Sequence, residues 1–402
     1  IAGCTFTGSN TPFVSISLDN NIEIFGNTFQ TTGADFINYF SLNSNDANPT
    51  FKLIKNTFET TDGSIGKINI GDLEDSEGFH GNVLIAKNTF KNTEIMMKGY
   101  KDENSIINII NNEFNKQGDI TYVNPALQMK DISGGVIYGN TFTNIDNGIE
   151  AETSSNLMFV DNHFSEVDGD VCIDLTFISN SIFSDNKING YGIGIKTVAN
   201  FDTPNFGNVY LENIFEDNSI GLLLGYSDQT TIAGNEFTYI KEIPGNGDVS
   251  ISHSQNTVLY ENEYPEHDEF IFVSNSYPNY FYGVDENLVY LKTKSDVYFH
   301  YPITIKVFDV NNKPLDNAQV VITDSVGNIV SKYLTGPAGW PINEDQYYYA
   351  FTKSSEGPPS TKSYKYSVFY NYGEEEDLEV VTGAIDVDIE PGEVSGGFIK
   401  II

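Results

Sequence analysis

A short motif of the form apolar-x-x-Asn-x-Phe returns throughout the first two thirds of the chain. An apolar residue stands three positions before each asparagine, and a phenylalanine, or once each an isoleucine and a tyrosine, stands two positions after it. The motif asparagines are Asn27, Asn56, Asn88, Asn112, Asn140, Asn162, Asn186, Asn213, Asn235 and Asn262, and Cys4 takes this position in an eleventh copy. Steps between copies vary from 22 to 32 residues, and the variable segments are rich in Gly, Ser, Asp and Asn. We expect these segments to be loops.

The residues around each motif predict short strands, because Val, Ile and Phe alternate with polar residues over four to six positions. The period is too short for paired-helix repeats, and leucine-rich repeats need leucines at fixed offsets rather than Asn and Phe. A parallel β-helix of about eleven coils fits better. In that fold each coil places the same residue in the same column, ~4.8 Å above its predecessor.

Two columns follow from this arrangement. The phenylalanines are expected to form an internal aromatic stack, in which Phe142 and Phe164 are buried neighbours. The asparagines are expected to form a ladder at one corner, where each amide bonds to the next. Asparagine also tolerates the left-handed backbone conformation that a tight bend requires, so we expect the bend at the asparagine itself.

The repeats resemble the degenerate, Asn-rich, right-handed parallel β-helix repeats of the NosD type in the pectin-lyase-like superfamily, over roughly residues 1–275. The resemblance implies an all-β fold. It implies no single activity, because members of the superfamily include polysaccharide lyases, glycosidases, epimerases, phage tailspikes, adhesins and surface proteins. Members of the pectate lyase type use an arginine base beside calcium-binding aspartates, and this chain contains no arginine.

A second domain is predicted from about Tyr301, where the motif stops and longer alternating strands begin. The segment 308–318 is similar to the turn and strand signature of carboxypeptidase-regulatory-like modules. That resemblance implies a small Ig-like or transthyretin-like β-sandwich over residues 301–402, with residues 276–300 as a junction. The acidic run 374–377 is expected on a solvated turn.

The net charge of −35 and the absence of arginine exclude nucleic acid as an expected partner and disfavour acidic polysaccharides. No stretch approaches the ~20 apolar residues that a bilayer-spanning helix needs, so we expect no membrane-spanning segment.

The strands that follow each asparagine offer one candidate catalytic pair, Glu152 and Asp174. Aligning these strands by their apolar positions predicts an outward column of Lys98, Lys130, Glu152, Asp174, Lys196, Gly225 and Ser252. Two carboxyls ~5 Å apart would match the pair of a retaining glycosidase. The favoured interpretation is that opposite charges alternate up a solvated sheet, so no catalytic residue is assigned.

Other candidate sites are weaker. The acidic loop 71–78 offers Asp72, Glu74 and Asp75 as oxygen ligands for Ca²⁺, and no other cofactor is expected. Five tyrosines between residues 277 and 298 could form a glycan platform, although packing at a domain junction is the commoner role of such residues.

The two cysteines should not form a disulfide with one another. Cys4 lies in the first coil and Cys172 in the seventh, so six steps of ~4.8 Å place them at least ~29 Å apart, beyond the ~7 Å limit between Cα atoms. Cys172 is expected to point outward between Glu150 and Gly194 and to be chemically quiet.

These features predict an extracellular or cell-surface structural or adhesive protein that can assemble with copies of itself into a lattice, sheath or fibre, or bind cell-envelope polysaccharide. The alternatives are a polysaccharide-active enzyme, meaning a lyase, epimerase or glycoside hydrolase, and a glycan-binding tailspike. A role without catalysis is favoured over the enzyme.

Overall fold

The structure is a computed structural model of the whole chain. The residues that it describes are 1–8, 12–16, 21–32, 35–39, 50–61, 64–71, 78–79, 81–100, 105–117, 125–238, 247–264, 270–302, 304–309, 311, 313–324, 326–337, 347–355, 360–361, 363–370, 378–386 and 396–400. They divide into two compact units, residues 1–257 with 262–273, and residues 258–261 with 274–402.

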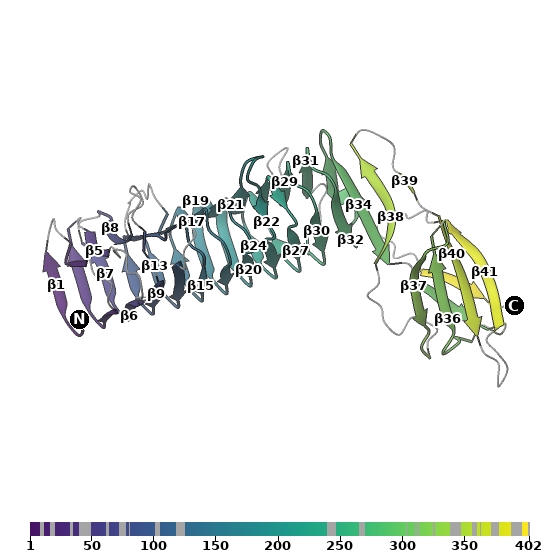
Figure 1. Cartoon of the computed structure of the whole chain (residues 1–402), viewed down its shortest axis with the longest axis horizontal. Helices are drawn as coiled ribbons and strands as arrows, with labels where there is room; N and C mark the ends of the chain where they lie inside the picture. The colour runs from purple at the N-terminus through teal and green to yellow at the C-terminus, as the bar shows by residue number, and fades with distance from the viewer. Residues whose placement is uncertain are drawn as a thin grey trace. The chain divides into compact units, whose positions relative to one another are not determined.

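The first unit is a solenoid of parallel strands, which lie side by side in successive coils (Figure 1). Within the first unit, the strands that precede the motif asparagines from Asn27 to Asn235 form what we call the first sheet. They are β3 (Ile22–Phe25), β6 (Thr50–Ile54), β9 (Gly81–Ala86), β12 (Ser105–Ile110), β15 (Gly134–Tyr138), β18 (Leu157–Val160), β20 (Ile182–Ser184), β23 (Val209–Leu211) and β27 (Thr231–Ala233).

The strands that follow each asparagine form the second sheet, in which most coils contribute two strands on either side of a corner. Those directly after the asparagine are β1 (Thr5–Gly8), β4 (Thr28–Thr31), β7 (Thr57–Thr60), β10 (Thr89–Lys91), β13 (Glu113–Asn115), β16 (Thr141–Thr143), β24 (Ile214–Glu216) and β28 (Glu236–Thr238). Those beyond the corner are β2 (Val14–Ile16), β5 (Asp35–Tyr39), β8 (Gly66–Ile70), β11 (Thr93–Lys98), β14 (Leu127–Lys130), β17 (Asn147–Glu152), β25 (Ile220–Gly225), β29 (Val249–Ser252) and β31 (Ile271–Ser274). Two long strands, β19 (His163–Thr176) and β21 (Lys187–Val198), span both positions, and β22 (Asn205–Phe206) pairs with β26 (Ser227–Asp228) outside the two sheets.

The solenoid has about nine turns, against the eleven coils expected from the motif count. Near the ends of the solenoid, Ala2 forms a single bridge to Phe25, and Glu263 of the last motif copy forms a bridge to Glu236.

The predicted asparagine ladder is confirmed. In a typical step, the backbone N–H and the side-chain Nδ2 of Asn112 both donate to Oδ1 of Asn140, each at 2.9 Å. The same Nδ2 donates to the carbonyl of Ile85, so the buried amide is satisfied on both sides. This pattern runs from Asn27 to Asn262 and links every coil to the next.

The position of the bend differs from the prediction. The residue with positive φ is the one before the asparagine, for example Lys55, Asn111 or Asp161, and none of the ladder asparagines has a positive φ. The side chain at the bend is exposed to solvent, whereas the asparagine amide must point into the coil to bond with its neighbours. One residue therefore cannot perform both tasks.

The predicted aromatic stack is also confirmed. Phe142 and Phe164 are fully buried, with ring centroids 4.5 Å apart, and Phe114 stacks on Phe142 at the same distance. A second buried stack lies on the first sheet, where Phe159 packs on Phe183 at 4.6 Å. Fixed ring spacing in successive coils excludes water from the solenoid core.

The second unit contains an antiparallel sheet in the order β37-β36-β40-β41 and a separate parallel pair, β35 with β42. Its elements are β30 (Thr257–Tyr260), β32 (Asn279–Tyr282), η1 (Glu286–Leu288), β33 (Val289–Leu291), β34 (Asp296–Pro302), β35 (Thr304–Phe308), β36 (Gln319–Thr323), β37 (Ile329–Leu334), β38 (Tyr347–Ser354), β39 (Ser360–Thr361), β40 (Ser363–Tyr370), β41 (Leu378–Asp386) and β42 (Gly396–Lys400). Strands β32, β33 and most of β34 lie within the residues expected to be a junction. The β-sandwich with a carboxypeptidase-regulatory-like fold stays a prediction.

No helix in the described part of the chain is both long enough and apolar enough to cross a bilayer.

Candidate functional site

The candidate site is the outward face of the second sheet where β14, β17, β19 and β21 run in register. Alternation along each strand places one set of side chains inside the solenoid, as for Leu127 and Met129 in β14, and the intervening set outside. The pairing of the strands then fixes which outward side chains are neighbours. Gln128, Glu150, Asp174 and Lys196 form one row, which we call the carboxylate row.

The predicted contact between Glu152 and Asp174 is wrong. Glu152 pairs with Thr176, and Asp174 pairs with Glu150. The cause is the corner before the strand: Ser165 pairs with a residue 22 positions earlier, whereas Val171 pairs with one 24 positions earlier. Two extra residues in this corner shift the rest of β19 along the sheet.

The register of the strands also tests the other neighbours predicted in the outward column. Lys98 pairs with Lys130, Lys130 with Glu152, and Asp174 with Lys196, as expected. Lys196 does not pair with Gly225, because its neighbour in the next coil is Leu223.

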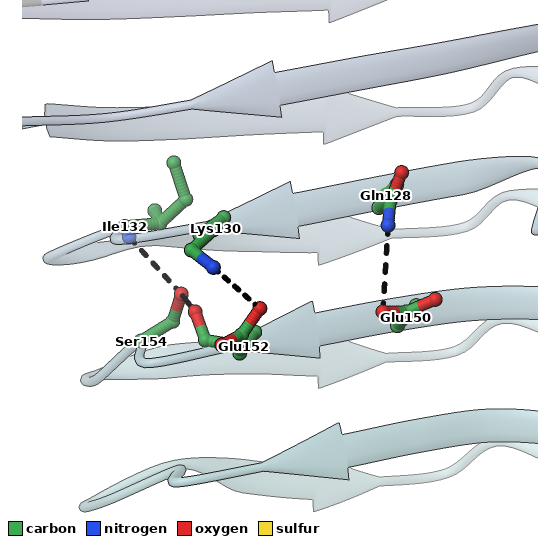
Figure 2. A network of polar contacts seen from close by, with 6 residues as sticks. All are labelled: Gln128, Lys130, Ile132, Glu150, Glu152 and Ser154. Atoms are coloured by element: carbon green, nitrogen blue, oxygen red, sulfur yellow. Dashed lines mark hydrogen bonds and ion pairs between the residues drawn. The ribbon is translucent and has the colours of Figure 1, made fainter. Parts of the chain in front are cut away.

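One ion pair between neighbouring coils lies beside the carboxylate row, and another lies within it. Lys130 Nζ lies 2.7 Å from Glu152 Oε2, and Lys196 Nζ lies 2.8 Å from Asp174 Oδ2 (Figure 2 shows the first of these). The hydrogen bond to Glu152 raises the pKa of Lys130, and burial opposes this effect. Figure 2 also shows the amide of Gln128, which donates to Glu150 Oε1 at 3.4 Å.

Glu150 and Asp174 are therefore the adjacent carboxylates of this face. Burial raises the pKa of Glu150, the charges of Asp174 and Glu152 raise it further, and the hydrogen bond from Gln128 lowers it. Asp174 is held by Lys196 through Oδ2, while its Oδ1 is buried without a hydrogen-bond partner. Neighbouring strands lie ~4.8 Å apart, so the two carboxyls are close enough to act on one bound group.

The candidate calcium ligands Asp72, Glu74 and Asp75 lie outside the described residues, as does the acidic run 374–377. Within the described ranges, no group of three or more His, Cys, Asp or Glu side chains is arranged to hold a metal ion.

The candidate tyrosine platform lies in the second unit and is partly packed. The rings of Tyr280 and Tyr298 stack at 5.5 Å, and Tyr282 stacks on His300 at 4.4 Å. Tyr277 is 62% exposed and belongs to neither stack. Two of these tyrosines thus stack on each other and a third stacks on a histidine, which leaves less ring surface for a glycan.

Both cysteines are free, as predicted, but Cys172 does not point outward. It is fully buried, and burial raises the pKa of its thiol. In the neighbouring coils the same interior column holds Gly148, Gly194 and Gly221. A Cβ on Gly148 would lie 3.1 Å from the ring of Phe164, and one on Gly194 would lie 2.8 Å from Phe215.

In both cases the aromatic ring belongs to the next coil. By the same relation we expect Cys172 to lie near Ile188, where the phenylalanine column is interrupted by a smaller side chain. The sequence contained this signal, because the only motif copy with isoleucine follows the only coil with a cysteine at this position. Alternation alone could not reveal it.

Residues 95–264 match the family model described as "Right handed beta helix region". With the parallel ladders described above, this confirms the predicted resemblance to right-handed parallel β-helix proteins for that segment. No curated protein sequence matches the chain significantly.

Several solved structures are similar. The periplasmic alginate epimerase AlgG shares 14% identity, with a TM-score of 0.39 over 68% of this chain and 76% of that one. PfbA, a surface adhesin of Streptococcus pneumoniae, shares 11% identity, with a TM-score of 0.37 over 84% and 90%. A pectate lyase from Bacillus sp. N165 shares 15% identity, with a TM-score of 0.25 over 64% and 75%. These values are too low to assign any of the three activities to this chain.

Proposed function

We propose that this chain is a structural or adhesive β-helix protein of the cell surface or extracellular space, and that it acts as a rigid scaffold without catalysing a reaction. Its partners are further copies of itself or cell-envelope polysaccharide. The net charge of −35 favours neutral over acidic polysaccharides, because an acidic polymer would be repelled.

One observation carries this proposal: five ion pairs of the described side chains each join neighbouring coils of the solenoid. They are Lys91 with Glu59, Lys116 with Asp146, Lys130 with Glu152, Lys187 with Glu216, and Lys196 with Asp174. Opposite charges that pair along the stack hold neighbouring coils together, and they engage five of the lysines with carboxylates of this chain. Together with the asparagine ladder, these ion pairs favour a rigid scaffold as the role of the solenoid.

The test uses the intact chain with purified cell-envelope polysaccharides. Sedimentation or surface binding measures attachment, and the same mixtures are assayed for new reducing ends, unsaturated sugars and epimerised residues. We expect attachment or ordered assemblies in electron micrographs, with no chemical change in the polysaccharide. A turnover that disappears in Asp174→Asn would overturn the scaffold proposal.

A glycoside hydrolase is the second candidate, and the adjacency of Glu150 and Asp174 favours it specifically. Glu150 with its raised pKa would be the proton donor, and Asp174 the nucleophile. Glu150→Gln and Asp174→Asn should then each abolish hydrolysis. Glu152→Gln is the matched control, since it removes a carboxylate from the same strand two residues away. Equal activity in all three variants would remove this candidate.

A further inference from the structure

The outward face of the first sheet is largely apolar and carries no charge along seven successive strands, from β9 to β27. Each strand presents two outward side chains there, which lie in two columns. The columns are Leu84, Asn108, Val136, Met158, Ile182, Val209 and Thr231, and Ala86, Ile110, Tyr138, Val160, Ser184, Leu211 and Ala233. We call these fourteen residues the apolar face.

The apolar face is unusual on this molecule. It carries no charged residue, although the whole chain has a net charge of −35. Large side chains on it are open to solvent: Tyr138 and Met158 are each 40% exposed. Exposed and contiguous apolar surface of this extent marks an interaction site on a soluble protein.

Charged and polar residues border the apolar face, as at the rim of a protein interface. Along the corner with positive φ, successive coils expose Lys55, Lys87, Asn111, Gly139, Asp161, Asp185 and Glu212. The rim is therefore cationic near its N-terminal end and anionic near its C-terminal end, with a glycine at the midpoint.

When the order of the rim residues is reversed in a second copy, its negative residues lie opposite the positive residues of the first. Two copies packed face to face, with the solenoids antiparallel and a two-fold axis crossing at Gly139, would bring Lys87 opposite Asp185. The same operation would bring Lys55 opposite Glu212. A two-fold contact of this kind uses one surface patch on both copies and closes without further growth.

The area of contact in such a pair follows from the overlap of the two apolar faces. With the axis at Gly139, strands β9 to β20 of the two copies face each other, and five strands at ~4.8 Å each and ~13 Å long give about 310 Å² per copy, or about 620 Å² for two. The rim and the flanking strands add to this area, and the total lies at the small end of specific interfaces, as expected for association in the micromolar range.

From these observations we propose that the apolar face binds a second copy of the chain, in an antiparallel two-fold pair centred near Gly139. This pairing specifies the surface through which copies of the chain associate. It rests on the proposed function, which includes such self-association. It also masks the apolar surface from water while the strongly acidic remainder of each copy stays solvated.

The first experiment is sedimentation of the whole chain over a concentration series. We expect a monomer–dimer equilibrium in the micromolar range for the native chain. Met158→Lys should raise the dimer Kd more than tenfold, because it buries an unpaired charge in the interface. Met96→Lys is the matched control, since Met96 is a partly buried methionine on the outward side of the second sheet. It should leave the Kd unchanged.

The second experiment tests the orientation. Lys87→Glu and Asp185→Lys should each raise the Kd about fivefold or more, and the double variant should restore it, because each charge then again meets its opposite across the two-fold axis. Far-ultraviolet circular dichroism and thermal melting confirm that every variant folds.

A native chain that stays monomeric at ~100 µM would overturn the pairing, and so would dimers equally stable in Met158→Lys. Binding of the monomer to neutral phosphatidylcholine vesicles, lost in Met158→Lys, would assign the face to a lipid surface instead.

Polysaccharide attachment is measured separately on Met158→Lys. If attachment persists without the dimer, only the pairing fails. If native dimers form but never attach to polysaccharide, the adhesive part of the function fails instead.

Discussion

Asp248 is a buried carboxyl whose ionisation should set part of the pH dependence of stability. It is 3% exposed, its Oδ2 has no hydrogen-bond partner, and burial raises its pKa to about 7 from an ordinary value of 3.8. The folded state therefore favours the protonated form. The associated stability is fully present below about pH 4 and is lost as the pH rises through 7.

We predict that Asp248→Asn is more stable than the native chain by roughly 2–4 kcal/mol at pH 8, and that the difference shrinks toward pH 4. Urea unfolding at several pH values measures this. Asp161→Asn, which removes an exposed carboxylate at a bend, is the control and should leave the pH profile unchanged. Native and Asp248→Asn profiles that run parallel would contradict the prediction.

The two cysteines should differ sharply in reactivity. Cys4 is exposed, whereas Cys172 is fully buried and its pKa is raised by burial. We predict that iodoacetamide modifies Cys4 within minutes in the native chain, and Cys172 only after unfolding. Peptide mass mapping measures both sites. Modification of Cys172 at the rate of Cys4 would place it outside the core.

At the scale of a coil, the aromatic column should carry much of the stability. Phe142 is fully buried between two stacked rings, so Phe142→Ala should cost ~3–5 kcal/mol through loss of contacts and formation of a cavity. Glu152→Gln removes only a partly exposed ion pair in the same coil and should cost less than ~1 kcal/mol. Denaturant unfolding compares the two, and similar losses would contradict the assigned packing.

The expected proximity of Cys172 and Ile188 predicts coupling between two neighbouring coils. Ile188→Phe should be destabilising by itself, because the larger ring would meet the thiol, as the glycine positions of other coils indicate. In a Cys172→Gly background the same change should be neutral or stabilising, because it extends the aromatic column. A double-mutant cycle measures this coupling, which we expect to exceed ~1 kcal/mol. Additive effects would show that the two side chains do not touch.

At the scale of the whole molecule, the net charge of −35 should make stability depend on salt. Raising NaCl from ~20 to ~200 mM screens repulsion between carboxylates and should raise the melting temperature by several degrees. If the calcium hypothesis is right, CaCl₂ at the same ionic strength should raise the melting temperature further. This additional increase should be absent in the double variant with Asp72→Asn and Asp75→Asn. Differential scanning calorimetry measures both effects. Equal curves in the two salts would leave screening as the whole cause.

The sequence alone determined the architecture, because a solenoid is built from contacts between neighbouring repeats. Once Asn140 and Phe142 are seen to repeat, their columns follow without knowledge of the loops, and the ladder and the stack were predictable residue by residue. The separation of the two cysteines followed from the same counting.

The tertiary structure decided what depends on register and on corners. Two extra residues in the corner before Val171 make Asp174 the neighbour of Glu150 instead of Glu152. The periodic pattern of the sequence does not show which corner contains additional residues. The apolar face was hidden for a related reason. A strand with apolar side chains on both sides, such as 157–160, is one continuous apolar run in the sequence. Only the folded coil shows which of these side chains are buried and which are exposed.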